Sequence, residues 1–173
     1  LMATDDTGLP STGSRHLTQT RIAGDHTATV HVEPFMWLNI QFNSSAVMSF
    51  HVTLYENGTV NLPRDTYLKD SVVTLYGGVA MGLETVNISL GGALIAYPPA
   101  KLGSDQASLY SLNSITVLDG GLFKYMGDSE ADDALTVNLE GGFVVKGGGL
   151  VNVNKLTLSA YNITVDTDGV IDA

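Results

Sequence analysis

The 173-residue sequence contains no cysteine, and its charged residues are mostly of one sign. Without cysteine, neither a disulfide framework nor a thiolate metal site can form. Eight Lys and Arg residues stand against 18 Asp and Glu residues, which gives a formal net charge of −10, and the basic residues form no cluster. Because such a surface repels phosphate backbones and anionic lipids, the composition argues against nucleic acid as a partner.

Long apolar runs and a helical pattern are also missing. No apolar run approaches the ~20 residues that a membrane-spanning helix needs, so we expect no membrane insertion. The sequence starts at Leu1 without the basic and apolar regions of a secretory signal. If the protein is exported, we expect its signal to lie upstream or to have been removed. No segment keeps a 3.6-residue period, which argues against a helical fold.

A repeated apolar–X–apolar triplet is the main pattern that the sequence does contain. Six triplets follow one another at nearly equal steps of about 21 residues, and the central residue is Thr in five of them. They occupy residues 52–54, 73–75, 94–96, 115–117, 135–137 and 156–158, and one step back reaches 30–32. Alternation with period two is typical of a half-buried strand. The alignment therefore predicts that these strands stack in one row.

Two further strand-like runs follow each triplet, and corners separate them. The corners contain Gly-Gly, Asn-Gly or Pro-Pro, at 57–58, 77–78, 98–99, 120–121 and 141–142. Gly permits positive φ and Pro resists continuing a strand, so both suit a sharp bend. Three short strands in a coil of ~21 residues predict a three-sided parallel β-helix over residues 27–173, which we expect to be right-handed. An antiparallel β-sandwich is the alternative.

The two ends of the sequence depart from the repeat. Residues 1–26 are polar and lack the triplet, so we expect an N-terminal arm or cap. The segment YNITVDTDGVIDA, residues 161–173, stops inside a coil. An open coil exposes unpaired N–H and C=O groups that invite another strand. We therefore expect the β-helix to continue, either in further coils of a longer chain or in a neighbouring subunit of the same kind.

Four Asn-X-Ser/Thr sequons are candidate sites for N-linked glycans. They begin at Asn43, Asn57, Asn87 and Asn162, a modest excess over what chance would supply. Together with the solenoid they favour an extracellular glycoprotein. The alternative is that polar strand and corner residues match the sequon by chance.

Two other groups of residues are candidate binding sites. Tyr55, Tyr76 and Tyr97 recur at the spacing of the repeat and are predicted to stack in a strip that binds sugar, packs against another rod or only stiffens the solenoid. The acidic segment GDSEADD suits Ca²⁺, which takes six to eight oxygen ligands, and a solvated acidic turn is the alternative. Its carboxylates are Asp128, Glu130, Asp132 and Asp133. We expect no other cofactor.

In coil length and corners, residues 30–173 resemble the parallel β-helices of the pectin-lyase-like superfamily. That resemblance implies a polysaccharide lyase or glycoside hydrolase, but the Gly-His-Gly and Arg-x-Lys signatures of polygalacturonase-type enzymes are absent. We therefore assign no catalytic residue and expect no enzyme, with a polysaccharide lyase or glycoside hydrolase as the alternative.

The chain is also similar to Gly-rich β-helical segments of large surface adhesins, which implies spacing, adhesion or polymerisation. We expect a structural module of an extracellular filament or cell-surface appendage that assembles end to end and carries glycans on its sides. A carbohydrate-binding adhesin module is the alternative.

Overall fold

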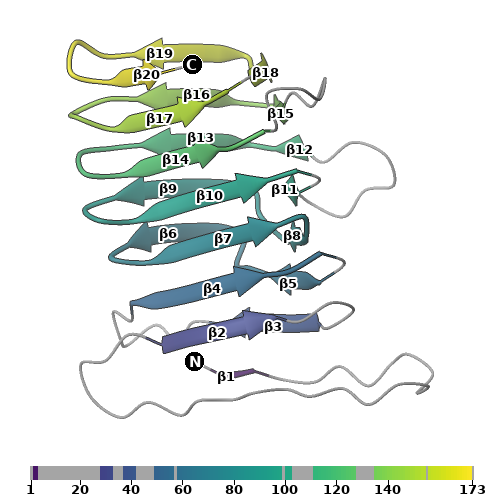
Figure 1. Ribbon diagram of the computed structural model, residues 1–173. Coiled ribbons are helices and arrows are strands. Elements are labelled where there is room, and N and C mark those ends of the chain that lie inside the picture. The colour runs from purple at the N-terminus through teal and green to yellow at the C-terminus, as the bar shows by residue number, and fades with distance from the viewer. Residues whose placement is uncertain are drawn as a thin grey trace.

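The computed structural model describes residues 2–3, 28–32, 37–41, 49–56, 58–98, 100–102, 111–127, 135–154 and 156–172. All regular structure in these ranges is β, and the strands of successive coils pair in parallel (Figure 1). The predicted parallel β-helix is confirmed. Among the described strands, the one antiparallel pairing joins β1 (Met2–Ala3) to β3 (Trp37–Gln41), so the antiparallel sandwich is excluded.

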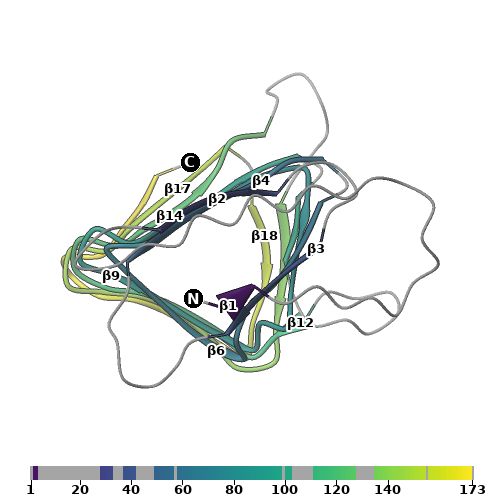
Figure 2. The same ribbon diagram turned by 90° about the horizontal axis from the view of Figure 1, so that it is seen from below.

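The coils have three sides, and the view along the axis is triangular (Figure 2). Side 1 comprises β2 (Ala28–Val32), β4 (Phe50–Leu54), β7 (Val72–Tyr76), β10 (Ala93–Tyr97), β14 (Leu122–Tyr125), β17 (Leu150–Val153) and β20 (Val170–Asp172). Side 2 comprises β3, β5 (Thr59–Asn61), β8 (Val79–Met81) and β11 (Lys101–Leu102), then a second sheet of β12 (Ser111–Leu112), β15 (Leu135–Leu139) and β18 (Leu156–Ser159). Side 3 comprises β6 (Asp65–Lys69), β9 (Thr85–Ser89), β13 (Ser114–Val117), β16 (Gly142–Val145) and β19 (Asn162–Val165).

The coils wind in a right-handed sense. In Figure 1 the chain runs from left to right along side 1 at the front, returns along side 3 at the back, and rises toward the C-terminus. Figure 2, seen from the N-terminal end, shows the same sense. This is the handedness expected from the sequence.

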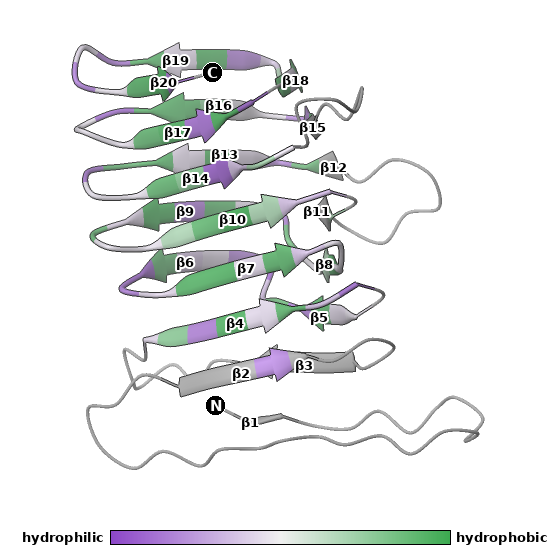
Figure 3. Cartoon of the chain, viewed as in Figure 1, coloured by the Kyte–Doolittle hydropathy of each residue, from purple (hydrophilic) through white to green (hydrophobic). Residues whose placement is uncertain are grey.

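The core is a column of side chains inside the triangle. Strand residues alternate between buried and exposed positions, as Figure 3 shows by the change from apolar to polar colour along the strands. Because successive strands are in register, buried residues of one coil lie on buried residues of the next. On side 1 one such row consists of Val52, Val73, Leu94, Phe123 and Val151, which are all fully buried.

The predicted row of six triplets is correct in its first half and wrong in its second. Val52 pairs with Val73 and Val73 with Leu94, as predicted. Leu94, however, pairs with Phe123, whereas Ile115 lies on side 3. The triplets at 135–137 and 156–158 pair with each other on side 2.

Two long coils explain this error. The steps from Leu94 to Phe123 and from Phe123 to Val151 are each about a third longer than the step from Val52 to Val73. The extra residues come with segments 103–110 and 128–134, which lie outside the described residues. Each insertion is about as long as one side of the triangle. One regular repeat after Leu94 therefore reaches Ile115, which has the same apolar pattern. Ile115 lies on side 3, however, the side that the chain passes through before it returns to side 1.

A row of glycines lies at the corner between sides 3 and 1, and Gly121 is its one member that the predicted corners included. The row consists of Gly92, Gly121, Gly149 and Gly169. A Cβ atom at any of these positions would overlap the backbone carbonyl oxygen of a residue on side 3 one coil below, such as Ile88 below Gly121. These glycines are thus required by the close approach of two backbones, since none of them has a positive φ.

The stacked core predicts a large effect of one side chain. Phe123 is fully buried, and its ring packs edge-on against Phe143 with 6.3 Å between centroids. We expect Phe123→Ala to lower the free energy of unfolding by about 3–5 kcal/mol. Lys124→Ala, at the next and outward position, is the matched control and should change it by less than about 0.5 kcal/mol. Urea denaturation measures both, and equal effects would contradict the described orientation of β14.

Candidate functional site

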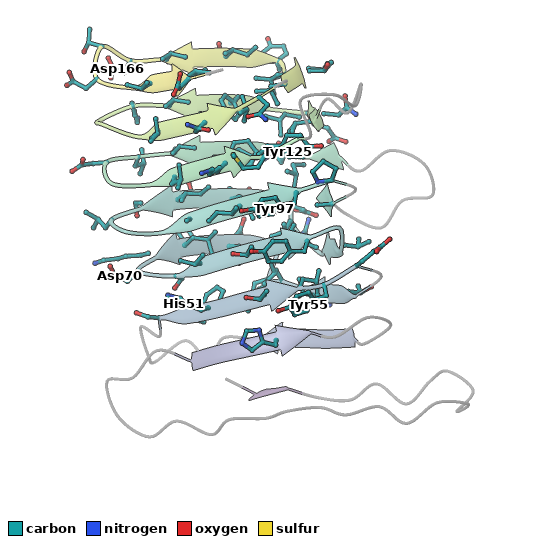
Figure 4. All side chains as sticks on the ribbon, viewed as in Figure 1. His51, Tyr55, Asp70, Tyr97, Tyr125 and Asp166 are labelled. Atoms are coloured by element: carbon teal, nitrogen blue, oxygen red, sulfur yellow. The ribbon has the colours of Figure 1, made fainter. Side chains whose placement is uncertain are left out.

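Four aromatic side chains stack on side 1. Tyr76 and Tyr97 end β7 and β10, Tyr55 follows β4, and His31 lies in β2. The ring centroids are 4.6 Å apart for Tyr76 and Tyr97, 5.9 Å for Tyr55 and Tyr76, and 6.4 Å for His31 and Tyr55. Figure 4 labels Tyr55 and Tyr97 near the end of side 1 at which the strands finish. We call these residues the aromatic row.

The geometry of the aromatic row limits what it can bind. Neighbouring tyrosine rings are within 15° of parallel, so their faces are turned toward one another. Sugars pack on a free aromatic face, and both faces of Tyr76 are occupied by its neighbours. The row therefore presents mainly ring edges to the solvent, although Tyr76 is 43% exposed. This arrangement suits stiffening of the rod or packing against another surface better than it suits sugar binding.

His31 was not predicted as a member of the aromatic row. It pairs in register with Thr53 and reaches Tyr55 diagonally, so equal spacing along the sequence does not reveal it. Among the described residues, the row ends at Tyr97. Tyr125, on the next strand of side 1, pairs with Ala96 and is directed into the core.

Two of the four sequons lie on the outer face of side 3. In β9 the strand alternation places Asn87 and Ser89 outside, while the intervening Ile88 is fully buried. In β19 Asn162 and Thr164 are both exposed, and Asn162 Nδ2 donates a hydrogen bond of 3.3 Å to Thr164 Oγ1. Asn43 and Asn57 lie outside the described residues. Occupancy of the sequons remains a prediction.

The C-terminal end of the rod is apolar and open. Ile163 is 51% exposed although Phe143, directly below it in the same row, is fully buried. Val165 and Ile171 are exposed in the same way above the buried Val145 and Val151. In the described part of the chain, β18, β19 and β20 each pair along one edge only. We call this surface the upper end face.

The N-terminal end of the rod is different. On side 1 the outermost described strand is β2, which pairs with β4 along one edge. On side 2 the corresponding edge of β3 is paired with β1 over two residues, Met2 with Gln41 and Ala3 with Ile40. The predicted arm or cap thus contributes one short antiparallel strand, and the rest of residues 1–26 lies outside the described residues.

The predicted calcium site cannot be placed, because Asp128, Glu130, Asp132 and Asp133 lie outside the described residues. Within the described ranges, no three His, Cys, Asp or Glu side chains come together as metal ligands would. The carboxylate of Asp166 is engaged within its own turn, since Oδ1 accepts a 2.8 Å hydrogen bond from the backbone N–H of Thr167, while the backbone C=O of Asp166 accepts the Gly169 N–H that closes the turn. The same described ranges contain no helix of the length and apolarity that crossing a membrane requires.

Comparison of the chain with protein-family models, with curated proteins and with solved structures finds no significant match.

The aromatic row predicts a measurable contribution to stability. We expect Tyr76→Ala to lower the free energy of unfolding by about 1–3 kcal/mol, because it removes two stacked contacts of about 0.5–1.5 kcal/mol each. Tyr76→Phe should retain most of the stability. Tyr161→Ala, at an exposed tyrosine on the top coil, is the matched control and should have an effect below about 0.5 kcal/mol. Denaturant titration of the three variants measures these free energies of unfolding. If Tyr76→Ala leaves the free energy of unfolding unchanged, the stack has no structural role.

Proposed function

We propose that the chain is a structural module of an extracellular filament or cell-surface appendage, and that its rods join end to end. The observation that carries this proposal is the upper end face, where side chains of the inward rows are exposed beside unpaired strand edges. The occupant that we propose is the lower end of a second copy, because its strands β2 and β3 continue the rows of sides 1 and 2. Further coils of a longer chain would cover the face in the same way. The β-helix would then continue across the junction.

Both the side chains and the backbone support such a junction. Covering Ile163, Val165 and Ile171 would remove apolar surface from water, and full burial of each such side chain contributes about 1.5–3 kcal/mol. On side 1 the edge of β20 that no described strand pairs would bind the edge of β2 that no described strand pairs in the next copy. On side 2 the two-residue pairing of β1 would have to give way to β18 of the incoming copy. That pairing is short enough to be displaced.

The charge and the proposed glycans on the sides of the rod favour end-to-end assembly over lateral association. A net charge of −10 makes parallel rods repel one another. Glycans on Asn87 and Asn162 would keep side 3 of each rod from contact with its neighbours. Hydrogen bonds between coils and the stacked core stabilise the rod without disulfides, which suits an extracellular setting for a chain that lacks cysteine.

Substitutions in one strand test the junction. We expect the unaltered protein to form filaments as its concentration rises, and Ile163→Asp to remain monomeric because a carboxylate would be buried without a partner. Thr164→Asp, next along β19 and paired with the half-exposed Val144, is the matched control and should still assemble. All three proteins are produced without glycosylation, because Thr164→Asp also removes the Asn162 sequon. Electron microscopy and light scattering over a concentration series measure the outcome. An unaltered protein that stays monomeric throughout, or an Ile163→Asp variant that assembles equally well, would contradict the proposal.

A further inference from the structure

Tyr67 is an exposed aromatic side chain within a strand of side 3, whereas the still more exposed Tyr161 lies at the corner before β19. Tyr67 lies in β6 and is 68% exposed. Among the described residues it has no ring partner, in contrast to the tyrosines of the aromatic row. Nor does it belong to the open upper end, because β6 is at the other edge of this sheet. A large ring that is held on a rigid strand and left uncovered is a surface on which a ligand can pack.

The residue next to Tyr67 on the coil above is the sequon asparagine Asn87. The two are register partners across the parallel pairing of β6 with β9. Parallel neighbours are ~4.8 Å apart and point the same way, so the two side chains leave the sheet side by side. A tyrosine reaches farther from its strand than an asparagine does. The outer part of the ring therefore lies beside whatever is attached to the Asn87 amide.

We propose that Tyr67 is the packing platform for the first N-acetylglucosamine of a glycan on Asn87. The inference rests on the proposed function, since it requires a secreted, glycosylated chain. The C–H groups on one face of the sugar ring would pack against the face of the tyrosine, and this contact would exist only in the folded glycoprotein. The glycan would thus stabilise the lower coils in addition to shielding side 3.

The attachment chemistry needs a lipid pyrophosphate-linked oligosaccharide as co-substrate of a transferase. The bond from Asn87 Nδ2 to C1 of the sugar forms, the bond from C1 to the pyrophosphate oxygen breaks, and the amide releases one proton. The hydroxyl of Ser89 completes the sequon and lies on the same outer face as Asn87. In the folded rod a sugar attached at Asn87 therefore points away from the core.

The second described sequon provides an internal comparison. Asn162 has Gly142 as its register partner on the coil below, and a glycine offers no side chain to a sugar. Two glycans on the same sheet would therefore differ in the side chain one coil below them, a tyrosine below Asn87 and a glycine below Asn162. They also differ above, where Thr116 pairs with Asn87 and no described strand covers Asn162, so each glycan is compared with its own unglycosylated variant. Only the glycan on Asn87 should stabilise the folded protein through a contact with Tyr67.

The test uses the full chain, produced in secreting eukaryotic cells, with one described sequon left at a time. The first background, N43Q/N57Q/N162Q, keeps Asn87, and Ser89→Ala then prevents its glycosylation without changing the asparagine. The second background, N43Q/N57Q/N87Q, keeps Asn162. In it, Thr164→Ala prevents glycosylation of Asn162 without changing the asparagine. Tyr67→Ala is added to all four proteins, and Tyr67→Phe serves as a variant that keeps the ring. Intact mass gives the occupancy and thermal unfolding gives the midpoint.

We expect the glycan on Asn87 to raise the midpoint by about 2–4 °C when Tyr67 or Phe is present, and to lose this gain with Tyr67→Ala. The effect of the glycan on Asn162 should be the same with and without Tyr67. Protons of the first sugar on Asn87 should also show a ring-current shift that disappears with Tyr67→Ala.

Two results would overturn the inference. A fully occupied Asn87 whose gain is independent of Tyr67 would refute the platform and leave the proposed function standing. An Asn87 that carries no sugar would refute both the platform and the glycosylation part of the proposed function. The proposed end-to-end junction would still be tested separately, by comparing the assembly of Ile163→Asp with that of the unaltered protein.

Discussion

The structure depends on hydrogen bonding between equal positions of successive coils. A single coil of three short strands encloses too little apolar surface to be stable alone, so each coil relies on the coils above and below. Parallel register places Val52, Val73, Leu94 and Phe123 in one buried row and keeps the aromatic row in line. The same constraint fixes Gly121 and its equivalents, because the backbones of neighbouring coils meet at that corner.

The proposed roles of the ends and the sides follow from this stacking. A solenoid hides its strand edges everywhere except at its ends, and the upper end face shows what remains when a coil has no neighbour above it: Ile163 is half exposed over a fully buried Phe143. Along sides 1 and 3, by contrast, each inner strand is paired on both edges, whereas on side 2 the described sheet is interrupted between β11 and β12. Side 1 carries the aromatic row, and side 3 carries Tyr67 beside Asn87.

Much of the fold could be predicted from the sequence because short strands with period-two patterns and regular corners are local features. Tyr55, Tyr76 and Tyr97 were found because they lie in coils of constant length. Ile115 was assigned to the wrong side because an insertion as long as one side leaves the regular spacing intact while the phase changes. The relation of Tyr67 to Asn87 was missed for a related reason, since those two residues belong to strands that the triplet alignment did not include. Asn43, Asn57 and the acidic segment lie outside the described residues.

Pairs of engineered cysteines test the register most directly, because the chain has no cysteine of its own. Ile95 pairs with Lys124 across β10 and β14, and both side chains are directed outward. At ~4.8 Å between strands, Ile95→Cys with Lys124→Cys meets the geometry of a disulfide. Ile95→Cys with Thr116→Cys, the pair that coils of constant length would bring together, lies on two different sides. The account predicts rapid oxidation of the first pair and none within the second, and cross-linking of the second pair in place of the first would contradict it.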